Sequence, residues 1–124
     1  MYLDIDFNSD EAIYMQLSNQ IILEIAMARL QEGDSLPSVR QMADLIGINM
    51  HTVNKAYTVL RQDGFVTIDR RRGAIISIDA DKRRALEEMR ENLAVILARG
   101  LCRNISREEV HELVDAVFDD YEKK

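Results

Sequence analysis

The chain has 124 residues, 22 of them acidic against 16 basic, and a formal net charge of −6. This length suits one small domain with an appendage, and no apolar run of about 18 residues is present that would span a membrane. The lone Cys102 excludes an intrachain disulfide, and the first residues carry no basic start or apolar signal core, so we expect a cytoplasmic protein.

Two elements are predicted in the first part of the chain. Apolar and acidic residues alternate over Tyr2–Phe7, which indicates a short extended arm. A long scaffold helix is predicted from about Ala12 to about Gln31, with Gly33 ending it. This helix is predicted from apolar residues at helical spacing, which are Ile13, Leu17, Ile21, Ile25 and Ala28.

Two short helices joined by a tight turn are predicted next. Ser38 and Gln41 have the spacing of a capping box, in which the Ser hydroxyl accepts a helix N–H and the Gln side chain reaches back. Gly47 is expected to end the first helix, because glycine reaches positive φ without a steric penalty. Asn49 is expected to cap the second helix, and Gly64 to stop it.

The spacing of the apolar residues in these two helices is typical of a helix-turn-helix. The small Ala43 stands where the helices would cross, since a bulky side chain there would push them apart. An ordinary pair of antiparallel helices has similar spacing, and in such a pair the same residues serve only as core. The helix pair by itself therefore leaves a DNA-binding motif and a structural hairpin both open.

A β-hairpin is predicted after the helices. Its strands are Phe65–Ile68 and Ala74–Ile78, which are rich in β-branched residues. Asp69, three consecutive arginines and Gly73 lie between them. Arginines at a hairpin tip suit the phosphate backbone or the narrow minor groove, whereas the alternative is a solvated, charged turn. Together with the helices, this hairpin makes Leu36–Ile78 a predicted winged helix-turn-helix.

The distribution of charge favours DNA binding by this segment. Met1–Val39 carries one basic against seven acidic residues, and Gly73–Lys124 carries nine against twelve. Arg40–Arg72 carries six basic against three acidic residues, a net charge of +3. Because affinity for a duplex depends on the number of phosphates that are neutralised, we expect salt-dependent binding through this segment.

The segment Ile13–Ile76 resembles the GntR family of bacterial transcription regulators. The matching motifs occur in order as Leu36–Arg40, Asn49–Tyr57, Asp63–Phe65 and the arginine-rich wing. The second-helix motif and the short tail are similar to the YtrA subfamily. The resemblance implies a mainly α fold with a small β-hairpin wing and a regulator of transcription that is not an enzyme. It further suggests a repressor that blocks polymerase by occupying the operator DNA of a transporter operon.

The resemblance also assigns individual residues to DNA. Arg40 looks like the family's DNA-contacting arginine, and the start of the second helix carries base- and phosphate-facing positions. Met50 stands where many relatives have arginine or proline, and Arg71 where many have glycine, so the operator sequence is not carried over. The predicted DNA-binding residues are Ser38, Arg40, Asn49, Met50, His51, Thr52, Asn54, Lys55, Arg70, Arg71, Arg72 and Gly73.

Two helices are predicted in the tail. The first runs from about Ala80 to Arg99 and is expected to end at Gly100. The second begins at Ser106, whose capping-box partner is Glu109. Each helix carries an apolar face that has to be covered.

The tail is predicted to pair with the same tail of a second chain. Residues Leu93–Ala98 are apolar on every side, and a helix of this kind must be covered all round. Two short helices form too small a core to cover themselves, and the remaining alternative is packing onto the chain's own DNA-binding domain. The predicted dimerisation residues are Leu86, Met89, Leu93, Ile96, Leu97, Val110, Leu113, Val114, Val117 and Phe118.

No further site is expected. His51 and His111 are too few and too far apart for a metal site, and the tail is too short to enclose a metabolite. We therefore expect no cofactor, no metal, no enzymatic activity and no dedicated effector domain. The sequence predicts a DNA-binding domain over 1–78 and a dimerisation segment over 79–124, so that a homodimer reads half-sites about one duplex turn (~34 Å) apart. The alternative function is a winged-helix protein-interaction module without a specific DNA site.

Overall fold

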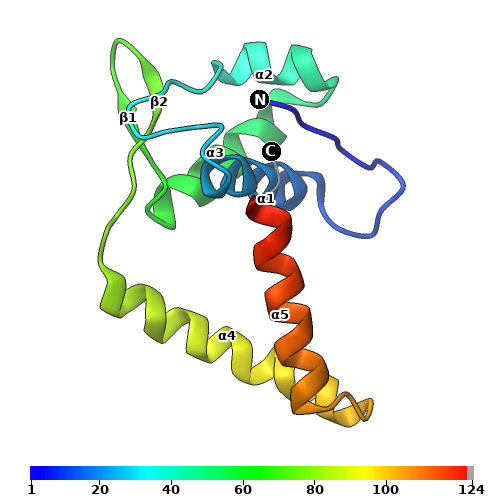
Figure 1. Cartoon of the computed structure of the whole chain (residues 1–124). Coiled ribbons are helices and arrows are strands. Elements are labelled where there is room, and N and C mark those ends of the chain that lie inside the picture. The colour runs from blue at the N-terminus through cyan, green and yellow to red at the C-terminus, as the bar shows by residue number, and fades with distance from the viewer. Residues whose placement is uncertain (123–124) are drawn as a thin grey trace. The chain divides into compact units, whose positions relative to one another are not determined.

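The structure, a computed structural model, describes residues 1–122 (Figure 1). Residues 123 and 124, which end the predicted dimerisation segment, lie outside the described residues. The chain divides into two compact units, Met1–Asp79 and the residues from Ala80 onward. The elements, in chain order, are α1 (Ile13–Ala26), α2 (Val39–Ile46), α3 (Met50–Gln62), β1 (Val66–Asp69), β2 (Gly73–Ile76), α4 (Lys82–Cys102) and α5 (Arg107–Glu122). The predicted fold class, mainly α with a small β-hairpin wing, is confirmed.

The core of the first unit is built around α3. This helix contacts α1, α2 and β1. The side chains that it buries follow helical spacing and are Val53, Ala56, Tyr57 and Leu60. Leu17 and Ile21 of α1, Met42 of α2 and Ile76 of β2 are fully buried against them, and each such side chain stabilises the fold by roughly 1.5–3 kcal/mol. Ala43, the small residue predicted at the helix crossing, is buried as well.

The helix-turn-helix begins and turns at the predicted residues. Ser38 Oγ accepts the N–H of Gln41 at 3.1 Å, and Gln41 Oε1 accepts the N–H of Ser38 at 3.0 Å. Gly47 follows α2 in the left-handed region at φ +77°. Asn49 then caps α3 by accepting the N–H of His51 at 2.7 Å. The predicted capping box and both predicted ends of α2 are confirmed.

The wing is an antiparallel hairpin of β1 and β2, close to the predicted strands. Backbone hydrogen bonds also join β2 to residues 33–36, which precede α2. The N–H of Gly33 donates to the Ile76 carbonyl and the N–H of Leu36 to the Ala74 carbonyl, both at 2.8 Å. The loop before α2 thus lies along the free edge of the hairpin and attaches the wing to the helices.

The prediction that the first helix reaches Gln31 is wrong. The helix α1 ends earlier, and Ala28 turns the chain in a left-handed conformation at φ +60°. The N–H groups of Arg29 and Leu30 then both donate to the Glu24 carbonyl, at 2.9 and 3.1 Å. The early turn brings Leu30 into the core. Helical periodicity does not reveal this turn, because alanine and leucine are both strong helix formers.

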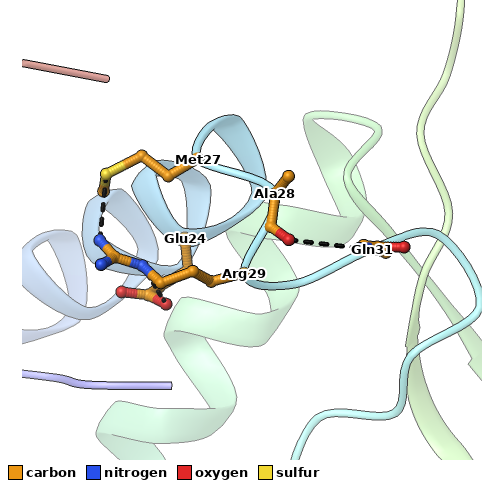
Figure 2. A network of polar contacts seen from close by, with 5 residues as sticks. All are labelled: Glu24, Met27, Ala28, Arg29 and Gln31. Atoms are coloured by element: carbon orange, nitrogen blue, oxygen red, sulfur yellow. Dashed lines mark hydrogen bonds and ion pairs between the residues drawn. The ribbon is translucent and has the colours of Figure 1, made fainter. Parts of the chain in front are cut away.

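Figure 2 shows the polar contacts that accompany this turn. The buried Glu24 carboxylate lies beside Arg29, with 3.2 Å between Oε2 and Nε. The Nε–H is not aligned with that oxygen, so the contact is an ion pair, and Oε2 accepts no hydrogen bond from residues 1–122. Arg29 Nη2 also donates to Met27 Sδ at 3.0 Å, and Gln31 Nε2 donates to the Ala28 carbonyl at 3.3 Å. The contacts with Glu24 and Met27 hold the side chain of Arg29 over the end of α1.

The N-terminal arm is held by two glutamines of α1. Gln20 accepts the N–H of Asp4 at 2.7 Å and donates to its carbonyl at 2.5 Å. Gln16 makes the same pair of bonds to Asp6, at 2.9 and 3.0 Å. Each side-chain amide satisfies the backbone groups that a neighbouring strand would otherwise pair with. The predicted extended arm therefore lies against α1, and its Ile5 packs on the core.

The second unit consists of α4 and α5. The prediction that Gly100 ends the first of these helices is wrong, because α4 continues past it and Asn104 makes the left-handed turn at φ +61°. Asparagine reaches this region more readily than most residues, and the N–H of Ile105 closes the turn on the Gly100 carbonyl at 3.0 Å. The predicted capping box of α5 is confirmed, with Ser106 Oγ and Glu109 Oε1 each accepting the other's backbone N–H at 3.1 and 2.9 Å.

Candidate nucleic-acid interface

The N-cap and first turns of α3 present five of the twelve predicted DNA-binding residues to solvent. Val53 and Ala56 face the core, which leaves the opposite face of the helix outward. The exposed residues on it are Asn49, Met50, His51, Asn54 and Lys55, whereas Thr52 is half-buried. Because Asn49 Oδ1 caps the helix, its side chain offers mainly amide N–H groups to a ligand.

An open groove lies between the tip of α3 and the start of α2. Its volume is about 560 Å³, and it is lined by Val39, Asn49, Met50, His51 and Asn54. Two of these side chains are apolar, and the other three can donate or accept hydrogen bonds. The groove therefore offers both kinds of contact at the exposed end of the helix. Val39 is a member that the sequence analysis did not single out.

A second groove continues this face toward the wing. Its volume is about 370 Å³, and Asn54 lines it as well as the first groove. Thr58 and Arg61 of α3 also line it, together with Gly73 of the wing. Arg61 is a candidate residue that sequence reasoning missed. It follows Asn54 by about two helical turns, and this spacing is the signal that could have revealed it.

Tyr57 sets the distance between the two helices at this groove. Its hydroxyl donates to the Pro37 carbonyl at 2.7 Å, which ties the segment before α2 to the middle of α3. Burial raises the pKa of the Tyr57 phenol far above its ordinary range, so the hydroxyl stays protonated and remains a donor. The predicted residue Ser38, next to Pro37, is thereby held at the groove.

Two predicted basic residues of the helices differ in whether their side chains contact other residues. Arg40, in the first turn of α2, is exposed, and its side chain makes no hydrogen bond or ion pair with any residue that the structure describes. Lys55 is exposed too, but its Nζ lies 4.1 Å from the centroid of the Tyr14 ring, a cation–π contact. Since Tyr14 belongs to α1, this contact holds the ammonium group where α1 meets α3.

The tip of the wing is ordered by Asp69. One oxygen of its carboxylate accepts the N–H groups of Arg71 and Arg72, at 2.7 and 3.0 Å. These hydrogen bonds stabilise the charged form and lower the pKa of Asp69 below its usual value. Asp69 also pairs with Gly73 across the hairpin. The ionised carboxylate therefore sets the shape of the turn and offsets part of its positive charge.

The three wing arginines are not equivalent. Arg72 turns back toward the body of the unit, where its Nη2 donates to the Gly33 carbonyl at 2.5 Å and lies 3.4 Å from Ser35 Oγ. Arg70 and Arg71 are exposed, and among the described residues their side chains have no partner. Only these two guanidinium groups project freely from the tip, a difference that the sequence of three arginines did not reveal.

All predicted dimerisation residues lie on α4 and α5. Neither helix has a buried side chain in the single chain. Ile96 and Leu113 are 60% and 63% exposed, and only Val110 of the predicted set is half-buried. Val95, Leu101 and Ile105 are large apolar residues that are also exposed and that are not among the predicted dimerisation residues. The two helices thus carry an extensive apolar surface that the single chain leaves uncovered.

Within residues 1–122, no three or more His, Cys, Asp or Glu side chains are grouped so that they could hold a metal ion. No helix in this part of the chain is long and apolar enough to cross a membrane.

Comparison with known proteins agrees with this arrangement. A family model described as bacterial regulatory proteins, gntR family, matches residues 11–76. The transcriptional repressor YtrA of Bacillus subtilis is 31% identical over 121 residues, which cover 95% of this chain and 93% of the relative. The structure of YtrA from Sulfolobus acidocaldarius, a GntR-family transcription factor, is 38% identical with a TM-score of 0.68, covering 81% of this chain and 97% of that chain. A transcriptional antiterminator from Listeria monocytogenes has a TM-score of 0.89 at 28% identity, covering 100% of this chain and 95% of that chain.

Proposed function

The chain belongs to the GntR family of bacterial regulatory proteins, and from this membership we propose that it is a homodimeric repressor that binds a pseudo-palindromic operator. The observation that carries the proposal is the continuous exposed face formed by the start of α3 and the groove that leads to the wing. We assign DNA binding to residues 1–78 and dimerisation to residues 79–124.

The geometry of the first unit supports insertion of α3 into a major groove. In a helix-turn-helix, the N-terminal residues of the second helix contact base edges. Met50, His51 and Asn54 are exposed at that end of α3, and Arg40 of α2 is free to reach a phosphate. Arg70 and Arg71 are placed at the wing tip for the phosphate backbone or the minor groove, where the potential is most negative.

The apolar surface of the tail supports a dimer. Exposed patches of this kind mark interaction surfaces, and a second copy of the tail offers a surface of the same chemistry. A twofold dimer places two recognition helices on half-sites about one duplex turn, ~34 Å, apart. The dimer therefore contributes both stability and the spacing of the operator.

Repression by operator occupancy is the mode of action that we propose, from the similarity to a known repressor. Among residues 1–122, the part of the chain after the wing holds the helices α4 and α5. Bound at an operator, the dimer would block polymerase by steric exclusion. The similarity to the YtrA repressor of Bacillus subtilis, which spans 93% of that protein, supports this mode of action. From the resemblance to the YtrA subfamily we propose a transporter operon as the target, and we propose the cytoplasm as the location.

The direct test of the function is a titration of the full chain against the duplex upstream of its own coding sequence. Binding at low salt that persists against excess unrelated DNA supports the proposal that the chain binds a specific operator. The other candidate, a winged-helix protein-interaction module, predicts no binding to this duplex even at low salt.

Arg40→Ala is expected to weaken operator binding by roughly 1–3 kcal/mol, because one free guanidinium contact is lost. Fluorescence anisotropy with a labelled operator measures the change. Arg83→Ala is the matched control, since Arg83 is an exposed arginine of α4 outside the proposed DNA face. Equal affinities of Arg40→Ala and wild type would contradict the role assigned to Arg40.

Arg71→Ala is expected to lower the slope of log affinity against log salt concentration by about 1, because one phosphate contact is lost, with similar losses of affinity on all duplexes. The measurement is a series of titrations at increasing salt. Arg72→Ala should change the slope less, since its guanidinium is bonded to Gly33 and Ser35. Equal changes of slope in the two variants would show that Arg72 leaves this position when DNA binds.

A further inference from the structure

Met50 is an apolar side chain at the reading end of α3. It is the first residue of the helix and is 44% exposed. Val39, the first residue of α2, lines the same groove. The two apolar side chains therefore share this groove with Asn49, His51 and Asn54. An isolated exposed methionine needs no explanation. A methionine at this position does, because the other exposed residues at this end of α3 that line the groove, Asn49, His51 and Asn54, are polar.

The chemistry of Met50 narrows what it can recognise in a duplex. Its thioether is only a weak acceptor and has no donor, so it cannot make the paired hydrogen bonds that arginine makes with guanine. It also carries no charge for a phosphate. The apolar feature that base pairs present in the major groove is the C5-methyl group of thymine.

We propose that Met50 and Val39 form an apolar cradle for the 5-methyl group of one thymine in each operator half-site. The inference rests on the proposed function, since it concerns the bases that the same face reads. Methionine is flexible enough to close around a methyl group. Burying that group between two apolar side chains removes it from water, which favours thymine over uracil and over cytosine at this position.

Asn54 extends this preference to the neighbouring base. It lies one turn after Met50 and lines the same groove. A carboxamide can pair bidentately with N6 and N7 of adenine, which no other base offers in the major groove. Asn54 lines the second groove as well, so its side chain stands between Met50 and the wing. We therefore expect adjacent A·T pairs in the half-site under the start of α3.

The test removes one methyl group at a time. A random duplex library is first selected with the full chain, and each thymine of the enriched half-site is then replaced by uracil. A buried methyl group is worth a factor of about four in affinity, so one thymine per half-site should show a loss of that size with the wild type. Met50→Ala should bind the thymine and uracil duplexes equally. Leu45→Ala is the control, because Leu45 is exposed on α2 but does not line this groove.

The outcomes separate this inference from the proposed function. If the wild type selects an operator but binds it equally well with uracil at every thymine, the proposed thymine-methyl site is wrong and the proposed operator binding still stands. A Met50→Ala variant that keeps the full preference for thymine overturns the assignment to Met50. A full chain that enriches no duplex even at low salt overturns both proposals.

Discussion

A Leu93→Glu variant is expected to be monomeric and to bind a palindromic operator at least roughly a hundredfold more weakly than the wild type, because the gain from engaging two half-sites at once is lost. Leu93 lies in the apolar stretch of α4 and is exposed in the single chain. Placing a carboxylate in an interface between two such helices leaves a charge without a partner in an apolar environment. Sedimentation velocity measures the assembly, and anisotropy measures the affinity.

The control for this variant must match its change in charge, since a more acidic protein binds DNA less well in general. Arg84→Gln changes the net charge by the same amount. Arg84 lies nine positions from Leu93, which places it on the opposite face of α4. The Arg84→Gln variant should therefore remain dimeric. Sedimentation of the wild type as a monomer at micromolar concentration would refute the tail interface.

Gly64→Ala is expected to lower the free energy of unfolding by about 3 kcal/mol, because it combines backbone strain with a collision. Gly64 has φ +83°, a conformation that favours glycine. A Cβ atom there would lie 2.8 Å from the Cβ of Asp79, and the two residues are joined by a hydrogen bond from the Asp79 N–H to the Gly64 carbonyl at 2.7 Å. The segment that leaves the wing would have to move. Urea denaturation followed by circular dichroism measures the loss.

Gly47→Ala separates the two contributions. Gly47 has a similar φ of +77°, but a Cβ atom would meet nothing within 4 Å. Its substitution should cost only the conformational penalty of roughly 1–2 kcal/mol. The difference between the losses of free energy of unfolding in the two variants therefore measures the cost of the collision at Gly64. Equal losses of stability would mean that Asp79 moves away without cost.

Local signals predicted much of the helix-turn-helix correctly. The Ser38–Gln41 capping box, the left-handed Gly47 and the Asn49 cap all appear at the predicted residues. Each depends on atoms that are at most a few residues apart, so the amino-acid types are sufficient to specify it. The hairpin was predictable for a related reason, since a β-branched run on either side of a turn favours it in many surroundings.

The failures occurred where distant residues compete with local preference. Gln31 was predicted to be helical, but the chain turns at Ala28 so that Leu30 can enter the core. Gly100 was predicted to end a helix, although glycine also fits within one, and Asn104 makes the turn instead. A single sequence presents both positions as acceptable alternatives, and packing selects between them.

The sequence by itself determined the order of the elements, the N-terminal caps of α2, α3 and α5 and the concentration of positive charge between Arg40 and Arg72, because these depend on residue type and on neighbours along the chain. Only the tertiary structure decided which side chains of that segment are free. It ties Arg72 to the loop before α2, holds Lys55 over Tyr14 and brings Val39 and Met50 to one groove. These contacts join residues far apart in the sequence, and they exist only once burial of the core has placed the helices and the wing against one another.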